Sequence, residues 1–290
     1  MKILLEDEKL TKNEKDEIEK LLTRKNKKFK TDLDHMWYLI NLVWDDYGCD
    51  NRNLNWKNID KFYLHPVWLL NGLFIETDRE SMRHRKSIAE YFKDKKGLKI
   101  LDYGGGFGTL AKEISKVTPS SKIDLYEPYA SKYAYKNIKE FKNVEIINHL
   151  KENYYNVLVN TDILEHVEKP IELIANYNKC LKSNGILISH WNFTPCIKCH
   201  LPKHFHFRYT FEKIIPLLGF TREMKNDKHG HYFKKISDVK QENLDKALMR
   251  EKYSKFVYPL NLGADKIKRI FVTILKELEV SETVKRIIKR

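Results

Sequence analysis

The middle of the chain alternates short apolar runs with longer segments whose apolar residues recur at helical spacing. Short apolar runs predict buried strands, and apolar positions three or four residues apart predict helices packed on one side. Strands this short, separated by helices, indicate a parallel sheet that is covered on both faces. We expect strands at 98–103, 122–126, 144–148, 156–160 and 185–190, and helices at 78–93, 109–117, 129–141 and 170–181.

Further along the chain the pattern closes the sheet and then becomes helical. A helix is expected at 211–218, and the segments 220–225 and 231–236 predict a hairpin at the sheet edge. The fold class that follows is α/β: a Rossmann-like, doubly wound, mostly parallel seven-stranded sheet with helical N- and C-terminal extensions. We place the boundaries at 1–77 for the N-terminal extension, 78–238 for the α/β domain and 239–290 for the basic C-terminal helices.

The N-terminal extension changes character after thirty residues. Residues 1–30 are almost all charged or helix-favouring, and they predict a solvated helix or a partly frayed arm. We expect Asp32 to cap a second helix that has an apolar face. The aromatic residues of the extension belong either to the core, which their helical spacing favours, or to the roof of a substrate pocket, which makes 1–77 a candidate substrate lid. They are Trp37, Trp44, Trp68 and Phe74.

Composition and charge narrow the class of protein. With 42% hydrophobic residues the 290-residue chain is apolar enough to fold, and its formal charge of +14 points to a polyanionic partner or substrate. Twelve of these fourteen charges lie in residues 181–290, which carry 23 basic and 11 acidic side chains. We find no apolar run that could span a bilayer, no secretion signal and no disulfide framework among the four cysteines, so we expect a cytoplasmic protein.

A glycine-rich turn after the first strand carries the clearest chemical signal. The strand contains Asp102 and leads through Gly104, Gly106 and Gly108 into a helix. Glycine lets the backbone approach a ligand closely, and a helix N-terminus offers free N–H groups. The second strand ends at Glu127, 23 residues after Gly104, where a carboxylate can bind ribose hydroxyls. These features together predict a site for a nucleotide-bearing cofactor.

A second motif follows the fourth strand and distinguishes between cofactors. Residues 162–167 read DILEHV, and residues 181–187, after the next helix, read LKSNGIL. With the glycine turn, these stretches resemble the class I S-adenosylmethionine-dependent methyltransferases, in particular their quinol- and small-molecule-methylating branch. The resemblance covers residues 80–236 and implies S-adenosylmethionine, rather than NAD, as the cofactor.

The resemblance also implies roles for particular residues. Glu127 would bind both ribose hydroxyls, and Asp162 with Ile163 would line the methionine and sulfonium side of the cofactor. The methionine part would be held by Asp102 and by the backbone of Gly104, Gly106 and Gly108. No acidic residue marks the adenine pocket at 148–150, so the residues that bind adenine stay open.

Three histidines are candidates for the catalytic base. A hydroxyl acceptor must lose its proton, and a histidine with a pKa near about 6.5 is suited to take it. His166, at the cofactor end of the sheet, either acts as this base or orders the loop around it. His204 and His206, in the segment after the fifth strand, either face the acceptor or pack among aromatic neighbours.

The segment after the fifth strand also contains the sequence Cys196-x-x-Cys199-His200. It matches the pattern of c-type haem attachment, a maturation that takes place outside the cytoplasm and is therefore disfavoured here. Two thiols with nearby histidines could also bind zinc, although a compact zinc knuckle spaces its second ligand pair further away. We favour a substrate loop without a metal.

Together these features describe an enzyme with an open choice of acceptor. The leading hypothesis is a cytoplasmic S-adenosylmethionine-dependent methyltransferase that acts on a hydroxyl of a polar or anionic small molecule or glycan precursor. A nucleic-acid (RNA or DNA) methyltransferase would suit the basic C-terminal third, but the Asn/Asp-Pro-Pro-aromatic motif of enzymes that methylate base amines is absent. A cofactor-binding scaffold without catalysis is the third alternative.

The C-terminal helix is the remaining candidate for contact with a partner. Lys and Arg flank its apolar face. We expect this face to pack on its own domain or in a homodimer, with peripheral contact to an anionic membrane as the second choice. Its apolar residues are Ile267, Ile270, Phe271, Ile274, Leu275 and Leu278.

Overall fold

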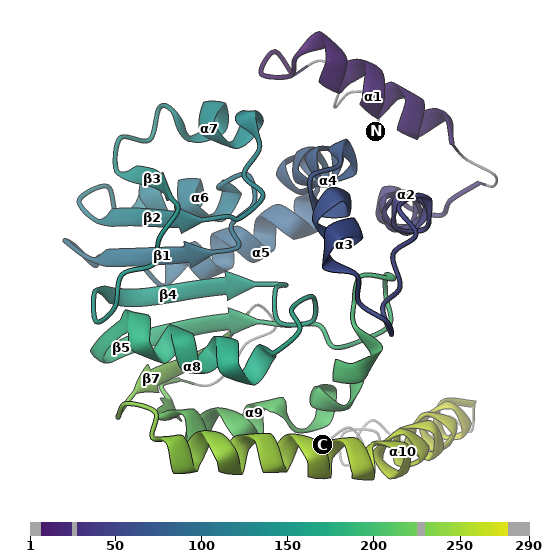
Figure 1. The fold of residues 1–290 in the computed structure, drawn as a ribbon, viewed down its shortest axis with the longest axis vertical. Coiled ribbons are helices and arrows are strands. Elements are labelled where there is room, and N and C mark those ends of the chain that lie inside the picture. Colours follow the sequence, from purple (N-terminus) through teal and green to yellow (C-terminus); the bar gives the residue numbers. More distant parts are fainter. Residues whose placement is uncertain (1–6, 25–27, 225–229, 278–290) are drawn as a thin grey trace.

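A computed structural model describes residues 7–24, 28–224 and 230–277, and seven strands within them form one sheet (Figure 1). The strand order is β3-β2-β1-β4-β5-β7-β6. The first five strands in this order run parallel, and β7 pairs antiparallel with both β5 and β6. The expected doubly wound, mostly parallel sheet is confirmed. Its strands are β1 Lys99–Tyr103, β2 Lys122–Tyr126, β3 Val144–Ile147, β4 Tyr155–Thr161, β5 Leu181–His190, β6 Phe220–Arg222 and β7 His231–Lys235.

Alternate residues of the strands feed two separate cores, one on each face of the sheet. Ile100 and Val157 point into the core that is covered by α5, α6 and α7. Their neighbours Leu101 and Leu158 point into the core on the other face, which α8 and α9 cover. The continuous apolar runs of the sequence arise from this double burial. The covering helices are α5 Arg79–Glu90, α6 Thr109–Val117, α7 Lys132–Ile138, α8 Pro170–Cys180 and α9 Phe211–Ile214.

The N-terminal helices form a third core beyond the carboxyl ends of the strands (Figure 1). This core includes Phe107 from the glycine turn and Cys199 from the segment after β5, so the N-terminal region packs directly against the α/β part. The expected solvated or frayed arm is only partly correct, since Ile18 and Leu21 of α1 are buried. The helices are α1 Lys12–Thr23, α2 Asp32–Asp46, α3 Trp56–Tyr63 and α4 Pro66–Thr77.

The N-terminal residues of α2 and α5 are capped by side chains that determine where each helix begins. Thr31, rather than Asp32, caps α2: its hydroxyl accepts a hydrogen bond from the Asp34 N–H, and the Asp34 carboxylate bonds back to Thr31. A hydroxyl followed three residues later by an acid makes a capping box. Asp78 caps α5 by accepting a bond of 2.7 Å from the Ser81 N–H, close to where the helix was expected to begin.

The C-terminal region consists of short 3-10 helices and one long α-helix. The 3-10 helix η2 spans Pro202–Tyr209, and η3, Ile215–Leu218, continues α9. The helix α10, Gln241–Glu277, packs along η2, η3 and α8. The side chains of Phe271, Ile274 and Leu275, together with Leu278 and Lys225, lie outside the described parts. None of the helices in the described ranges is long and apolar enough to cross a membrane.

Candidate active site

The carboxyl ends of four parallel strands meet at one edge of the sheet. In the register of the ladder Tyr103 stands opposite both Tyr126 and Asn160, and Thr161 stands opposite His190. The residues that follow these strand ends therefore share the edge where ligands of open α/β sheets bind. They are Gly104, Glu127, Asp162 and Trp191.

The glycine turn after β1 takes a conformation that favours glycine at three positions. Gly104, Gly106 and Gly108 have φ of 72°, 54° and 76°. A Cβ on Gly104 would meet the Ile163 Cδ1 atom at 2.2 Å, whereas a Cβ on Gly106 would have no atom within 4 Å. The turn thus presses against Ile163 on one side and leaves room for a ligand to approach the backbone at Gly106.

Glu127 connects the second strand to this turn. Its carboxylate accepts hydrogen bonds from the Gly106 N–H at 3.0 Å and from the Tyr129 N–H at 3.1 Å. Burial raises the pKa of Glu127, and the two N–H donors oppose that rise. A carboxylate has about four lone-pair sites, so it can bond to both ribose hydroxyls of a bound cofactor in addition to these donors.

Asp102 lies beneath the glycine turn. It is 1% exposed, and within the described residues its Oδ2 atom has no hydrogen-bond partner. Burial raises the pKa of Asp102 to about 7, against the charge of the Arg85 guanidinium. A Cβ on Gly105 would meet this carboxylate at 2.5 Å, so Asp102 supports the turn from below.

Asp162 follows β4 in a left-handed conformation, with φ of 55°. Its Oδ1 atom lies 2.8 Å from Nδ1 of His190, the last residue of β5. Burial raises the pKa of Asp162, but the hydrogen bond and charge of His190, together with Arg85, outweigh it and hold that pKa well below its usual range. Asp162 is therefore ionised and fixed in place beside the glycine turn.

A single cavity of about 790 Å³ connects this edge with the N-terminal helices. Among the expected site residues, Gly104, Gly106, Glu127, Asp162, Ile163 and His166 line it. The lining does not include Asp102, Gly108, His204 or His206, nor the segment 148–150 where an adenine contact was sought. These residues fit S-adenosylmethionine, since an open glycine backbone and two carboxylates converge where its ribose and its methionine end would lie.

Aromatic side chains line the cavity on both the side of the N-terminal helices and the side of the glycine turn. Tyr63 stacks on Tyr129 with ring centroids 5.1 Å apart, and sequence reasoning missed both residues, although Tyr129 stands only two positions after Glu127. Within the described chain the Trp68 indole N–H has no hydrogen-bond partner. Trp44 instead packs in the core, where its ring meets Phe62 edge-on. The lining aromatics are Trp37, Trp56, Tyr63, Trp68, Phe74, Tyr103, Phe107 and Tyr129.

Three donor groups converge at one end of the cavity. One ligand atom each of Glu165, His166 and His200 lies within 4.8 Å of the others. Nδ1 of His166 faces the Cys199 carbonyl at 3.1 Å, and Nδ1 of His200 faces the Thr194 carbonyl at 2.7 Å. These contacts place the ring N–H at Nδ1, so both Nε2 atoms keep a lone pair.

The electrostatics of this group follow from its burial. Burial, followed by the nearby His200, lowers the pKa of His166 to about 3, so the ring is neutral at pH 7. Glu165 is 1% exposed; one oxygen accepts a bond from the Asn192 N–H at 2.9 Å, and the other lacks a partner within the described residues. Two imidazoles and a carboxylate could hold a divalent cation, or an imidazole could accept a proton from a bound hydroxyl.

The cysteines do not join these donors. Cys196 Sγ lies 2.9 Å from the Thr194 hydroxyl, and Cys199 is 1% exposed. Burial raises the pKa of the Cys199 thiol, which therefore stays protonated. Within the described residues the donor group at this site is formed by Glu165, His166 and His200, without either thiol.

His204 and His206 lie in η2, on the side away from the cavity lining. Nε2 of His204 faces the Val167 carbonyl at 2.8 Å, and its ring stacks on Phe207. Nδ1 of His206 faces the Ser254 hydroxyl of α10 at 2.8 Å. Burial lowers the pKa of His204 to about 3 and that of His206 to about 4. Of the three candidate bases, the structure brings His166 alone to the cavity.

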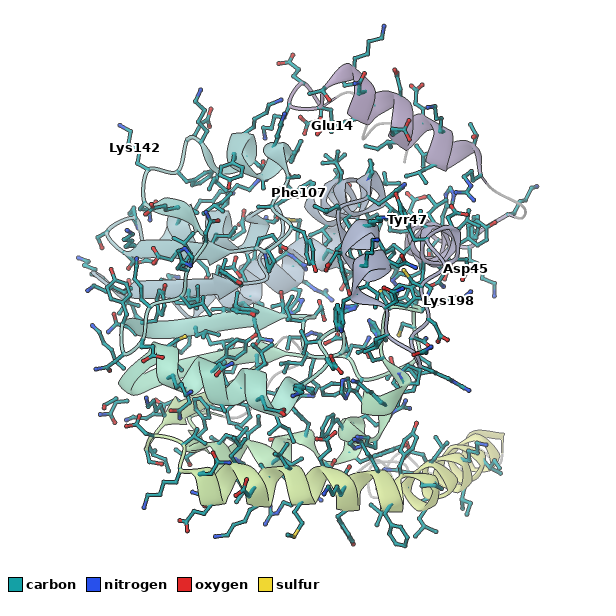
Figure 2. The ribbon with its side chains drawn as sticks, viewed as in Figure 1. Glu14, Asp45, Tyr47, Phe107, Lys142 and Lys198 are labelled. Atoms are coloured by element: carbon teal, nitrogen blue, oxygen red, sulfur yellow. The ribbon has the colours of Figure 1, made fainter. Side chains whose placement is uncertain are left out.

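The segment between β5 and η2 is fastened to α2. Figure 2 shows Lys198 and Asp45 side by side, and the Lys198 ammonium lies 2.6 Å from the Asp45 carboxylate. The Lys198 N–H donates to Asn41 Oδ1 at 2.7 Å, and the Asn51 amide donates to the Lys198 carbonyl at 2.9 Å. Because Cys196, Ile197 and His200 line the cavity, these bonds join its two sides.

Comparison with known protein families identifies the family of this chain. A family described as a methyltransferase domain matches residues 75–237, more than half of the chain. The chain belongs to the class I S-adenosylmethionine-dependent methyltransferases. The family expected from the glycine turn and the second motif is thus confirmed, together with S-adenosylmethionine as its cofactor.

The curated relatives of this methyltransferase are O-methyltransferases. It is 31% identical over 147 residues to a malonyl-[acyl-carrier protein] O-methyltransferase of Halalkalibacterium halodurans, covering 46% of this chain and 54% of the relative. It is 30% identical over 109 residues to a ubiquinone biosynthesis O-methyltransferase of Rickettsia canadensis, covering 36% and 46%. This methyltransferase therefore spans about half the length of the curated relatives it matches.

The chain overlaps in part with a solved structure. A SAM-dependent methyltransferase from Aquifex aeolicus is 17% identical, with a TM-score of 0.47, and the overlap covers 55% of this chain and 94% of that one.

Proposed function

We propose that this methyltransferase transfers the methyl group of S-adenosylmethionine to a hydroxyl oxygen of a small molecule that carries a ring. The cavity that joins the cofactor turn to the aromatic N-terminal helices is the observation that supports it. The names of both curated relatives, as O-methyltransferases, support oxygen as the acceptor atom.

The protein would promote methyl transfer mainly by aligning the acceptor oxygen with the methyl group. Bound S-adenosylmethionine supplies a methyl group on a sulfonium; a bond from the acceptor oxygen to this carbon forms as the carbon–sulfur bond breaks. Gly104, Gly106 and Glu127 would fix the ribose and methionine end, and Asp162 with Ile163 would border the sulfonium. Holding the acceptor in line behind the methyl group supplies much of the acceleration.

His166 is the residue we propose to accept the hydroxyl proton. It lines the cavity, and its Nδ1 contact with the Cys199 carbonyl leaves Nε2 as an acceptor. Burial keeps the ring neutral at pH 7, and its pKa of about 3 makes it a weak base. It therefore takes the proton as the oxygen–carbon bond forms, when the hydroxyl proton has become strongly acidic, and then passes it to water. His204 and His206, which lie outside the cavity lining, are not part of this proposal.

The lining of the cavity favours a ring over a strongly anionic acceptor. Arg85 is the one Lys or Arg among the described lining residues, and its charge acts on Asp102 and Asp162. The aromatic rings of Tyr63 and Trp68 line the cavity and suit a planar body. We therefore propose a ring-bearing hydroxyl compound in preference to a phosphorylated substrate or glycan precursor.

Two measurements test this proposal. Calorimetry with S-adenosylmethionine should show binding, and a panel of phenols and other hydroxyl compounds should show methyl transfer by mass. His166→Ala should reduce turnover by about a hundredfold or more with the donor affinity unchanged, because general-base catalysis supplies that much.

His204→Ala is the matched control, since it removes a buried histidine that does not line the cavity. Equal losses of turnover in both variants would refute the role of His166. Absence of donor binding at millimolar concentration would overturn the proposed activity, and donor binding without turnover on any compound would favour a scaffold.

A further inference from the structure

The helix α10 has two faces of opposite character. Its domain-facing side carries Ala247 and Ser254, both buried. The same side binds η2 through polar contacts: Ser254 with His206 at 2.8 Å, and the Asp265 carboxylate with the Tyr209 hydroxyl at 2.5 Å. Figure 1 shows α10 along the outer border of the molecule, with β7 and α9 on its inner side. The helix is thus anchored through one face only.

The opposite face carries a row of large apolar side chains, which we call the outer stripe; Gly263 interrupts it between Leu260 and Ile267, close to the helix-internal Pro259. These six side chains are 61–79% exposed. At 100° per residue they fall within an arc of about 100°, and at 1.5 Å per residue they extend over about 32 Å. Exposed apolar side chains gathered on one helix face in this way mark a binding surface. The outer stripe consists of Met249, Tyr253, Phe256, Leu260, Ile267 and Ile270.

Both margins of the outer stripe are basic. Helical spacing places three exposed cations on each side, Lys246, Arg250 and Lys268 on one and Lys252, Lys255 and Lys266 on the other. Of these, the Arg250 guanidinium also donates to the Lys213 carbonyl at 3.0 Å. Between Lys246 and Ile270 the acidic residues are Glu251 and Asp265, and helical spacing places both towards the domain-facing side. Glu251 pairs with Lys255 at 2.6 Å, and Asp265 bonds to Tyr209.

We propose that the outer stripe of α10 docks this methyltransferase on an anionic lipid surface. A helix with an apolar face between rows of Lys and Arg lies in the membrane interface, with the apolar side chains among the acyl chains and the cations at the anionic headgroups. The long stems of the lysines can reach upward from the margins while their ammonium groups stay in water. The proposal does not depend on the identity of the methyl acceptor or on the role of His166 as the base.

Charge also decides against a second copy of the chain as the occupant. If the outer stripes of two copies packed together, a basic margin of one helix would lie beside a basic margin of the other, whether the helices ran parallel or antiparallel. The flanking positions of a coiled coil meet in the same way. Each margin carries cations of the same sign, so the pair would repel along its length. An anionic surface instead neutralises both margins at once.

Vesicle flotation with the full chain tests this inference. We expect binding to vesicles of phosphatidylcholine that contain about 30% phosphatidylglycerol, because the basic residues of both margins act together on anionic headgroups. We expect little binding to phosphatidylcholine alone. Phe256→Ser with Leu260→Ser should weaken binding at least tenfold. Lys252→Gln with Lys268→Gln should weaken it about fivefold per lysine, because each cation near the surface contributes about that factor.

Matched controls use exposed residues away from α10. Ile236 is 63% exposed, and Ile236→Ser should leave vesicle binding unchanged. The double variant Lys96→Gln with Lys142→Gln should also leave it unchanged. Unchanged thermal unfolding of every variant shows that the fold is intact. Failure of the parent to float with anionic vesicles would overturn the proposal, and so would a dimer in sedimentation that Phe256→Ser with Leu260→Ser dissociates.

Discussion

At the scale of single residues, glycines with the same backbone conformation serve different purposes. Gly97, Gly104 and Gly106 all have φ between 54° and 72°. A side chain on Gly97 would meet no atom within 4 Å, one on Gly104 would collide with Ile163, and one on Gly106 would enter the cavity. Backbone strain, packing and ligand access can therefore be separated by substitution.

We predict three different outcomes for alanine at these positions. Gly97→Ala should lower the free energy of unfolding by about 1 kcal/mol through its positive φ and leave the affinity for S-adenosylmethionine unchanged. Gly106→Ala should cost a similar amount and weaken donor binding about tenfold or more, because the added methyl group occupies the approach to the backbone. Gly104→Ala should cost about 2–4 kcal/mol, since the contact with Ile163 adds to the strain.

Urea unfolding and calorimetry with the donor check these outcomes. Equal donor affinity in Gly97→Ala and Gly106→Ala would contradict the assignment of Gly106 to the cofactor site.

At the scale of elements, the N-terminal helices provide both a core and one wall of the cavity. The sequence favoured a core position for its aromatic residues, and Trp44 and Phe74 are buried in the core. Phe74 also lines the cavity, as do Trp37 and Trp68. Helical periodicity cannot make this distinction. It identifies the apolar face of α2 or α4, but whether that face meets another helix or an open space depends on how the helices stand over the strand ends.

We predict that Trp68→Phe and Trp44→Ala separate these two roles. Trp68→Phe replaces the indole with a smaller ring and so reduces the aromatic wall of the cavity; the KM for the acceptor should rise about fivefold while the donor affinity stays constant. Trp44→Ala should lower the free energy of unfolding by about 3–5 kcal/mol, because it leaves a large hole in a packed core.

Steady-state kinetics and urea unfolding of both variants measure the two effects. An unchanged acceptor KM in Trp68→Phe would show that the Trp68 indole does not contact the acceptor.

At the scale of the whole molecule, the positive charge and the chemistry are separated. The cavity has a single described Lys or Arg in its lining, whereas α10 carries basic residues along both margins of its outer stripe. The charge excess of residues 181–290 therefore supports an anionic surface as the partner of α10 more than an anionic acceptor in the cavity. Only the tertiary structure shows this separation, since both regions contribute to one net charge.

Buried histidines also make stability depend on pH across the whole molecule. Burial lowers the pKa of His204 from its ordinary value of 6.5 to about 3, so the folded state stays neutral where the unfolded chain takes up a proton. Its contribution to stability is complete above about pH 6.5 and is lost as the pH falls towards 3. Asp102, whose pKa burial raises to about 7, has the opposite sign, so only a difference between variants isolates the histidine.

We predict that His204→Gln flattens the fall of stability between pH 6.5 and 5. Its slope should be smaller than that of the parent by about 1.4 kcal/mol per pH unit, the value for one proton. Urea unfolding at several pH values measures both slopes, with the exposed His149→Gln as the control. Coincident slopes for parent and His204→Gln would contradict the prediction.

The sequence by itself determined the sheet, the family and the position of the cofactor turn. Apolar runs mark strands buried on both faces, and the glycines, Glu127 and Asp162 follow strand ends that a parallel register brings to one edge. These features are local in the chain or fixed by topology. Two features were predicted less well. The apolar spacing in α1 is too weak to show that the helix buries one face, and the start of α2 depends on the Thr31 hydroxyl beside Asp32.

Only the tertiary structure decided which candidates reach the cavity. The sequence offers His166, His204 and His206 alike as candidate bases, yet His166 lines the cavity and the others bond to the Val167 carbonyl and to Ser254. Tyr63, Tyr129 and His200 join the site from three distant segments. Burial on one side of a helix or loop depends on partners far along the chain, and spacing within a segment carries no information about them.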